Sequence, residues 1–369
     1  MTKKINTRNS GVELLRIVAI LLIVMSHCLP FYGSPSFKFY VNLNLATKDI
    51  DHLIMIFIKY FGQIGNCVFI VISSHYLIDN NYIKWDKVKQ IIFDSFIFSF
   101  VILIICIICG VNVSSKTLLQ QLLPITFQGC WFVGCYLFLY LLHPFINLII
   151  QKSNKLDLLR ITTILVVLYS VLPNVFGDYK YYNNFLIGFI TIYFVTAYFK
   201  LYLKNSSDNL ALNIKFILIG VAVILFLISF TNILGNKYDM FNNKMLKWNI
   251  FSNPFIIILS IGLFNCFKKL QFYSNRVNTI ASLTLYIYMI HENPLIRDNF
   301  KPWIFNVLND YNIWLCILFL NFLTLIFCIP ISYVYLKLFQ NHIYYIFNNL
   351  INKFKFIYKK IENYLMKIT

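Results

Sequence analysis

Long apolar runs recur along the whole chain and alternate with short connections rich in lysine and asparagine. Each run has about 20 residues, the length that an α-helix needs to cross about 30 Å of hydrocarbon. The runs lack the alternating pattern of membrane strands, so they predict an all-α protein. We expect a bundle of about ten transmembrane helices, at residues 12–31, 52–78, 90–111, 130–150, 158–176, 184–203, 213–234, 252–267, 279–296 and 313–337.

The composition supports a polytopic membrane protein. Hydrophobic residues make up 59% of the chain and charged residues only 12%, with a mean hydropathy of +0.70. A soluble domain of this composition would expose large apolar patches to water. We expect residues 1–340 to form one transmembrane domain and residues 341–369 to form a basic amphipathic segment that lies along the inner membrane surface.

The net charge of +18 comes mainly from lysines and arginines concentrated in alternate connections. The positive-inside rule then places both termini in the cytoplasm. Attraction to anionic lipid explains this charge better than binding to nucleic acid, which we do not expect. The nine cysteines lie in or beside apolar runs as small packing residues, so the sequence predicts no metal site.

The first apolar run, residues 11–30, carries charges that a plain membrane anchor lacks. Arg16 and His27 are eleven positions apart, so both project from one helix face, roughly 16 Å from each other along the axis. Glu13 precedes Arg16 by three residues, close enough to neutralise and orient the guanidinium. Because charge inside a bilayer is costly, the run indicates a functional site.

His291 and Glu292 end a late apolar run on the outer side, which His27 also approaches. Two histidines and a carboxylate can therefore meet there. A neutral histidine within reach of a hydroxyl can act as a general base or relay a proton. Arg16 is suited to hold the polar part of a donor molecule, because a guanidinium does not release its proton.

Two other groups of polar residues have alternative interpretations. Lys84 and Lys87 either follow the positive-inside rule or hold the phosphates of an acyl carrier such as coenzyme A. Lys59 either extends to the membrane surface or has a function inside the bundle. Asp94 is a buried carboxylate for which we expect Lys59, Arg16 or a backbone donor as partner.

The outer connection at residues 235–250 is rich in asparagine and lysine and contains Trp248. Aromatic faces and amides suit a glycan, but a solvated loop without a binding function is the favoured interpretation.

Four segments in order resemble the acyltransferase 3 family of bacterial integral-membrane proteins. The opening GVELLRIVAILLIVMSH carries the spacing of Arg16 and His27 that is typical of the family. The other segments are ISSHYLI at 72–78, WFVGCYLFLYLLHPFIN at 131–147 and SLTLYIYMIH at 282–291.

The resemblance implies a membrane O-acyltransferase of the bacterial plasma membrane. Such a protein moves an acyl group, usually acetyl, from cytoplasmic acyl-CoA to a hydroxyl of a cell-surface or envelope polysaccharide. His27 and Arg16 match the essential pair of the family, and Lys84 and Lys87 fall where relatives often carry a basic pair near the donor. His75 is a departure, because the family usually has glycine at this position, which puts the local helix packing in doubt.

Two other function classes compete with this interpretation. A polysaccharide transporter or flippase also needs intramembrane charges, but the repeated halves and paired broken helices of many transporters are not evident. A non-enzymatic component that works with polysaccharide-assembly proteins would use Arg16 and His27 only as a structural pair. For the enzyme, the expected partners are acyl-CoA, a glycan acceptor and membrane lipid.

Overall fold

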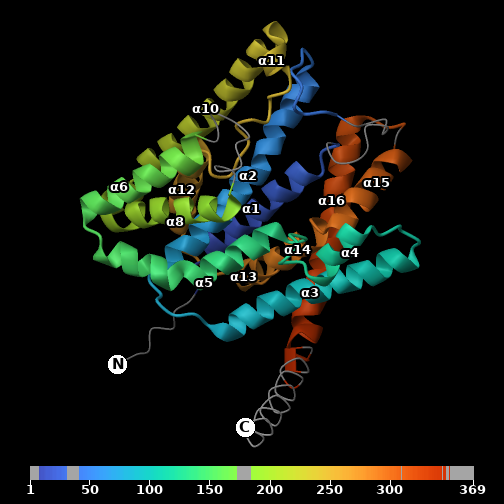
Figure 1. The fold of residues 1–369 in the computed structure, drawn as a ribbon, viewed down its shortest axis with the longest axis horizontal. Coiled ribbons are helices and arrows are strands. Elements are labelled where there is room, and N and C mark those ends of the chain that lie inside the picture. The colour runs from blue at the N-terminus through green and yellow to red at the C-terminus, as the bar shows by residue number, and fades with distance from the viewer. Residues whose placement is uncertain are drawn as a thin grey trace, which may run out of the picture.

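The computed structural model describes residues 8–30, 41–172, 184–308, 310–342, 344, 345 and 349. Their regular elements are all helical (Figure 1). The elements are α1 (Ser10–His27), α2 (Ile50–Leu77), α3 (Trp85–Ile108), α4 (Ser115–Leu122), α5 (Trp131–Lys152), α6 (Lys155–Val166), η1 (Val167–Val171), α8 (Phe185–Tyr202), α9 (Lys204–Ser207), α10 (Leu210–Lys237), α11 (Asp239–Asn242), α12 (Pro254–Lys268), α13 (Asn275–Ser282), α14 (Thr284–His291), η2 (Ile296–Phe300), α15 (Lys301–Val307), α16 (Ile313–Val334) and η3 (Tyr335–Phe339).

The predicted all-α membrane bundle is confirmed. Within the described residues, seven helices are long and apolar enough to cross a membrane: α1, α2, α3, α5, α8, α10 and the continuous stretch Ile313–His342. The other three predicted spans coincide with α6 and η1, with the shorter apolar helix α12, and with the pair α13 and α14. The count of ten spans therefore stays a prediction. Most of the expected segment at 341–369 lies outside the described residues.

The asparagine-rich connections have a structural role at the starts of helices. In the described part of the chain, six helices begin directly after an asparagine whose side-chain oxygen accepts a hydrogen bond from an amide of the first turn. These amides have no partner within the helix, so the asparagine satisfies a donor that would otherwise be exposed at the membrane surface. The six residues are Asn9, Asn154, Asn184, Asn209, Asn253 and Asn312.

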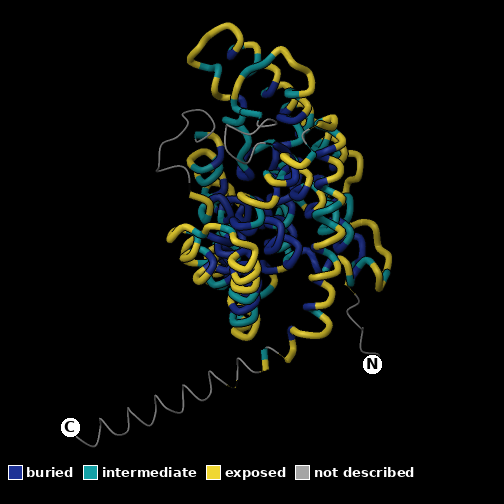
Figure 2. Tube along the Cα trace, turned by 90° about the vertical axis from the view of Figure 1, so that its right-hand side faces the viewer, coloured by how far each residue is buried: buried dark blue, intermediate teal, exposed yellow. Residues whose placement is uncertain are grey.

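Burial separates a packed interior from a lipid-facing surface. Buried residues gather in the middle of the bundle, around α1 and α2 (Figure 2). By contrast, α10 and α16 expose large apolar side chains such as Phe226, Ile233 and Phe322. Water would disfavour this apolar surface, whereas lipid tails accept it.

The central pair of the bundle is α1 packed antiparallel against α2, and two glycines of α2 allow the close contact. A Cβ atom at Gly62 would lie 2.5 Å from Ser26 Oγ, and one at Gly65 would lie 2.6 Å from the backbone oxygen of Ala19. Small residues at such positions let helix backbones approach closely. The contact holds the C-terminal end of α1, which carries His27, against α2.

Candidate active site

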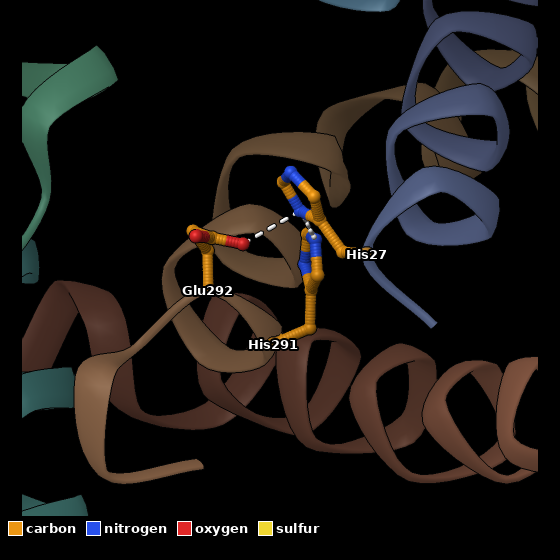
Figure 3. A group of neighbouring side chains, drawn as sticks. All are labelled: His27, His291 and Glu292. Atoms are coloured by element: carbon orange, nitrogen blue, oxygen red, sulfur yellow. Dashed lines mark hydrogen bonds and ion pairs between the residues drawn. The ribbon is translucent and has the colours of Figure 1, made fainter. Parts of the chain in front are cut away.

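Three titratable side chains meet where α1 and α14 end (Figure 3). His27 is the last residue of α1, His291 is the last residue of α14, and Glu292 follows it directly. Nδ1 of His27 lies 2.6 Å from Oε2 of Glu292 and 3.3 Å from Nε2 of His291. The structure therefore brings together the two histidines and the carboxylate that the sequence placed on one side of the membrane.

The neighbouring acceptors define which nitrogen of His27 carries the proton. Nδ1 of His291 lies 2.7 Å from the backbone oxygen of Ile287 and donates to it, so Nε2 of a neutral His291 has a lone pair. Nδ1 of His27 then faces two acceptors, this lone pair and the Glu292 carboxylate, and must carry the proton. The lone pair of a neutral His27 is therefore on Nε2, which points away from both partners in Figure 3. This arrangement suits a general base.

Glu292 is held in place from both sides. Its Oε1 accepts a hydrogen bond from Arg297 at 3.2 Å, while Oε2 faces His27. The next residue, Asn293, exchanges two amide hydrogen bonds with Gln121 of α4, of 2.8 and 3.2 Å. Asn293 and Gln121 are both buried, so this pair fixes the backbone that follows α14 and with it the position of the carboxylate.

Two buried lysines lie against the C-terminal end of α1. Lys59 of α2 donates to the backbone oxygen of Ser26 at 3.4 Å, and Lys301 of α15 donates to that of His27 at 3.2 Å. The last carbonyls of a helix have no partner within it and carry the negative end of its dipole, so ammonium groups are favourable there. Lys59 is 7% exposed and does not extend to the membrane surface, which corrects the first interpretation of this residue.

The same three side chains can be tested as a metal site. One ligand atom each of His27, His291 and Glu292 lies within 4.8 Å of the others, and two histidines with one carboxylate form a common ligand set. However, the cationic groups of Lys59, Lys301 and Arg297 surround the cluster and oppose a further cation. They suit instead the negative charge that develops on oxygen during acyl transfer.

A cavity of about 390 Å³ extends from the basic residues Arg8, Arg16 and Lys87 to aromatic residues deeper in the bundle. Arg16 reaches it from α1 while its NH1 lies 3.7 Å from Oε2 of Glu13, the predicted partner. Lys87 donates to the hydroxyl of Tyr136, 2.8 Å away. Three cations at one cavity suit an anionic ligand such as a phosphate ester.

Lys84 occupies a different place from Lys87. It is the N-cap of α3, its backbone amide donates to the Tyr140 hydroxyl at 3.1 Å, and its side chain is not among those that line the cavity. Of the two lysines that the sequence singled out, the structure thus brings only Lys87 to this cavity.

The inner end of the cavity is one side chain away from the histidine cluster. Phe132 and Tyr288 line the cavity and contact each other, with ring centroids 5.4 Å apart. The Tyr288 ring also packs edge-on against His291, at a centroid distance of 5.8 Å. His27 does not line the cavity. Tyr288 therefore lies between the cavity and the cluster, with Phe132 packed against it.

Asp94, also at the cavity, has partners that were not expected from the sequence. Its carboxylate accepts hydrogen bonds from Tyr335 at 2.6 Å, Gln340 at 3.1 Å and Tyr286 at 3.2 Å. The donors are therefore tyrosine and glutamine side chains and not Lys59, Arg16 or a backbone amide, as the sequence led us to expect. The tyrosines and the glutamine come from segments far along the chain, so only the tertiary structure brings them to α3.

Several residues of the site were not selected from the sequence. Lys301 and Arg297 stand in a connection between apolar runs, and Tyr288 is one of many aromatic residues in an apolar run. Lys59, by contrast, stands out in the sequence, because a lysine in the middle of a membrane helix is by itself a candidate functional residue.

Comparison with known proteins identifies the family of the chain. The sequence model of the acyltransferase domain of the acyltransferase 3 family matches residues 9–335, which include α1, α14 and every residue that lines the cavity except Arg8 and Leu336. No curated protein sequence and no solved structure matches the chain significantly. Because the family match covers most of the chain and the structure is a bundle of apolar helices, the chain belongs to the acyltransferase 3 family and is a multi-pass membrane acyltransferase.

Proposed function

We propose that the protein moves an acyl group, most simply acetyl, from cytoplasmic acyl-CoA to a hydroxyl of a cell-surface or envelope polysaccharide in the bacterial plasma membrane. The observation that carries this proposal is the cavity with Arg8, Arg16 and Lys87 at one end and Tyr288, in contact with His291, at the other. The cavity thus brings cations suited to a phosphorylated donor to within one side chain, Tyr288, of the cluster that contains the candidate base His27.

The cationic part of the cavity holds the phosphates of the donor. Arg16 and Lys87 approach it from α1 and α3, and Arg8 lies at the start of α1. Glu13 orients Arg16 but leaves its positive charge in place, since the guanidinium stays protonated. The thioester end of the donor then points along the apolar part of the cavity, toward Phe132 and Tyr288.

Transfer takes place at His27. Nε2 of His27 takes the proton of the acceptor hydroxyl as its oxygen attacks the thioester carbonyl, and Glu292 stabilises the imidazolium that forms. Lys59 and Lys301 stabilise negative charge on the carbonyl oxygen. A new carbon–oxygen bond forms, the carbon–sulfur bond breaks, and the thiolate leaves with the proton from His27. Phe132 and Tyr288 must move aside for the thioester to reach His27.

The test uses a strain that lacks this gene and expresses the wild type, His27→Ala or His52→Ala. Ester-linked acyl groups on extracted envelope polysaccharides are measured by mass spectrometry and NMR, with membrane levels of the three proteins matched. His52 is a half-buried histidine at the start of α2, outside the cluster, and is the control.

We expect acylation with the wild type and His52→Ala and a loss of at least 100-fold with His27→Ala, because a general base contributes about 10²- to 10⁴-fold. Full acylation by His27→Ala would contradict the role of His27. If the deletion strain and the strain expressing the wild type have the same acylation but differ in export of the polymer, the result would contradict the proposed enzymatic activity and favour a transporter.

A further inference from the structure

A second cavity, of about 260 Å³, lies between α2, α8 and α12, with α9 across one end. It shares no lining residue with the cavity described above. The helices α2, α8 and α12 end here, at Leu77, Tyr202 and Lys268. Because these are apolar helices of the membrane bundle, the cavity lies at the level of the lipid headgroups.

The mouth of this cavity is cationic. Lys200, Lys204 and Lys268 line it. Lys200 is already engaged, since its Nζ lies 2.6 Å from the backbone oxygen of His75 and 2.6 Å from Oδ2 of Asp79. Lys204 and Lys268 take part in none of the ion pairs found among the described residues.

One carboxylate lies near these lysines without pairing with them. Asp208 also lines the cavity, but the ammonium that bonds to it is that of Lys269, which donates to its backbone oxygen. Three lysines therefore face the two carboxylates of Asp79 and Asp208, and Asp79 is already paired with Lys200. The mouth keeps an excess of positive charge that an anion can neutralise.

The inner wall of the cavity is apolar, and His75 forms part of it. The His75 ring packs on Phe264 with centroids 4.7 Å apart, and Val71, Phe199 and Ile261 add to the apolar part of the wall, beside the polar Thr196 and Asn265. A glycine at position 75 would leave this part of the wall empty. The residue that departs from the resemblance thus shapes a pocket with a cationic mouth and an apolar interior.

We propose that this cavity binds the phosphate headgroup of an anionic membrane lipid. Lys204 and Lys268 contact the phosphate, and the glycerol and first acyl carbons lie against the wall formed by His75 and Phe264. A free phosphate would use only the lysines, whereas a lipid uses both parts of the cavity. Basic pockets between membrane helices are suited to such headgroups. The proposal is independent of the acyl-transfer reaction, because it concerns a different cavity.

The test measures lipid binding by the purified full-length protein. Native mass spectrometry follows binding of phosphatidylglycerol, with phosphatidylcholine as the zwitterionic lipid, to the wild type and to the double variant Lys204→Gln/Lys268→Gln. The matched control is Lys152→Gln/Lys155→Gln, which removes two exposed lysines at the junction of α5 and α6. A third arm adds inorganic phosphate as competitor.

We expect the cavity variant to bind phosphatidylglycerol about 30-fold more weakly than wild type, since each lysine near an anionic lipid contributes about 1 kcal/mol. The control variant should bind phosphatidylglycerol as the wild type does. Phosphatidylcholine should bind weakly to all three proteins. Equal binding by the cavity variant, or an equal loss in the control, would overturn the proposal. Displacement of the lipid by inorganic phosphate at a comparable concentration would assign the site to a free phosphate instead.

Discussion

At the scale of single residues, the reactivity of His27 depends on what surrounds its two nitrogens. Glu292 and His291 face Nδ1, so the proton of a neutral His27 stays on this nitrogen. Arg297 donates to the Glu292 carboxylate and forms a separate ion pair with Asp298. Burial opposes the charge of Arg297, but hydrogen bonds to Asp298 and Glu292 outweigh it and raise the pKa of the guanidinium. Arg297 is therefore charged throughout the physiological pH range.

We expect Glu292→Gln to lower the turnover number for acyl transfer by about 10²- to 10⁴-fold, because the amide keeps the volume but no longer stabilises the imidazolium. Initial rates with labelled acyl-CoA in isolated membranes measure this. Asp298→Asn is the control, since it removes a carboxylate from Arg297 without contacting His27. A Glu292→Gln protein with more than half of the wild-type rate would contradict the role of the carboxylate.

The same geometry predicts how the rate depends on pH. Protonation of Nε2 removes the base, so the rate should fall as the pH decreases through the range in which histidine titrates. Arg297 stays positively charged in this pH range. The fall in rate therefore cannot arise because Glu292 loses its ion pair with Arg297. Rates measured between about pH 5 and pH 8 test this, and a rate that rises as the pH decreases over this interval would argue against histidine as the base.

At the scale of the elements, the contact of α1 with α2 positions the cluster. The glycines of α2 let the backbones approach, and Lys59 and Lys301 hold the carbonyls at the end of α1. The position of His27 is thus fixed by three elements, α1, α2 and α15.

Gly65→Ala tests this packing. The added Cβ would lie 2.6 Å from the backbone oxygen of Ala19, which cannot rotate away, so the helices must separate. We expect a loss of about 1–3 kcal/mol in the free energy of unfolding, seen as a lower midpoint of thermal unfolding in detergent. Gly134→Ala in α5 is the control, because its Cβ would lie 3.5 Å from the nearest atom, the backbone oxygen of Ile125, which is an ordinary contact. Equal midpoints of thermal unfolding for Gly65→Ala and Gly134→Ala would show that the close approach of α1 and α2 does not contribute to stability.

At the scale of the whole molecule, the bundle keeps the cationic cavity and the histidine cluster in separate compartments. Arg16 lines one and His27 belongs to the other, although both lie on α1. Tyr288, which lines the cavity and contacts His291, stands between them, with Phe132 packed against it. In the proposed reaction, this division separates His27 from the acyl donor until the aromatic side chains move.

The two lysines near the start of α3 offer a matched test of the donor compartment. Lys87→Gln should raise the KM for acyl-CoA about tenfold or more, since a hydrogen bond to a charged group is worth about 1.5–3 kcal/mol. Lys84→Gln should change it by less than threefold, because the Lys84 side chain does not line the cavity. Steady-state kinetics in membranes measure both values. Equal effects of the two substitutions would place the donor phosphates outside this cavity.

The sequence alone determined the membrane bundle and the candidate residues on α1. Runs of about 20 apolar residues can satisfy their backbone groups in lipid only as helices, so the fold class follows from hydropathy. Arg16, His27 and their spacing stand out because charge in an apolar run is costly. His291 and Glu292 could also be placed near His27, since all three lie at the same end of their runs.

Only the tertiary structure decided which partners these residues have. The contacts of Asp94 with Tyr335, and of Lys301 with the end of α1, join segments more than 200 residues apart, and no helical period encodes such distances. The partition at Tyr288 likewise depends on how α14 packs against α5 and α1. Hydropathy fixes which residues enter the membrane, whereas side-chain packing between helices decides which of them meet.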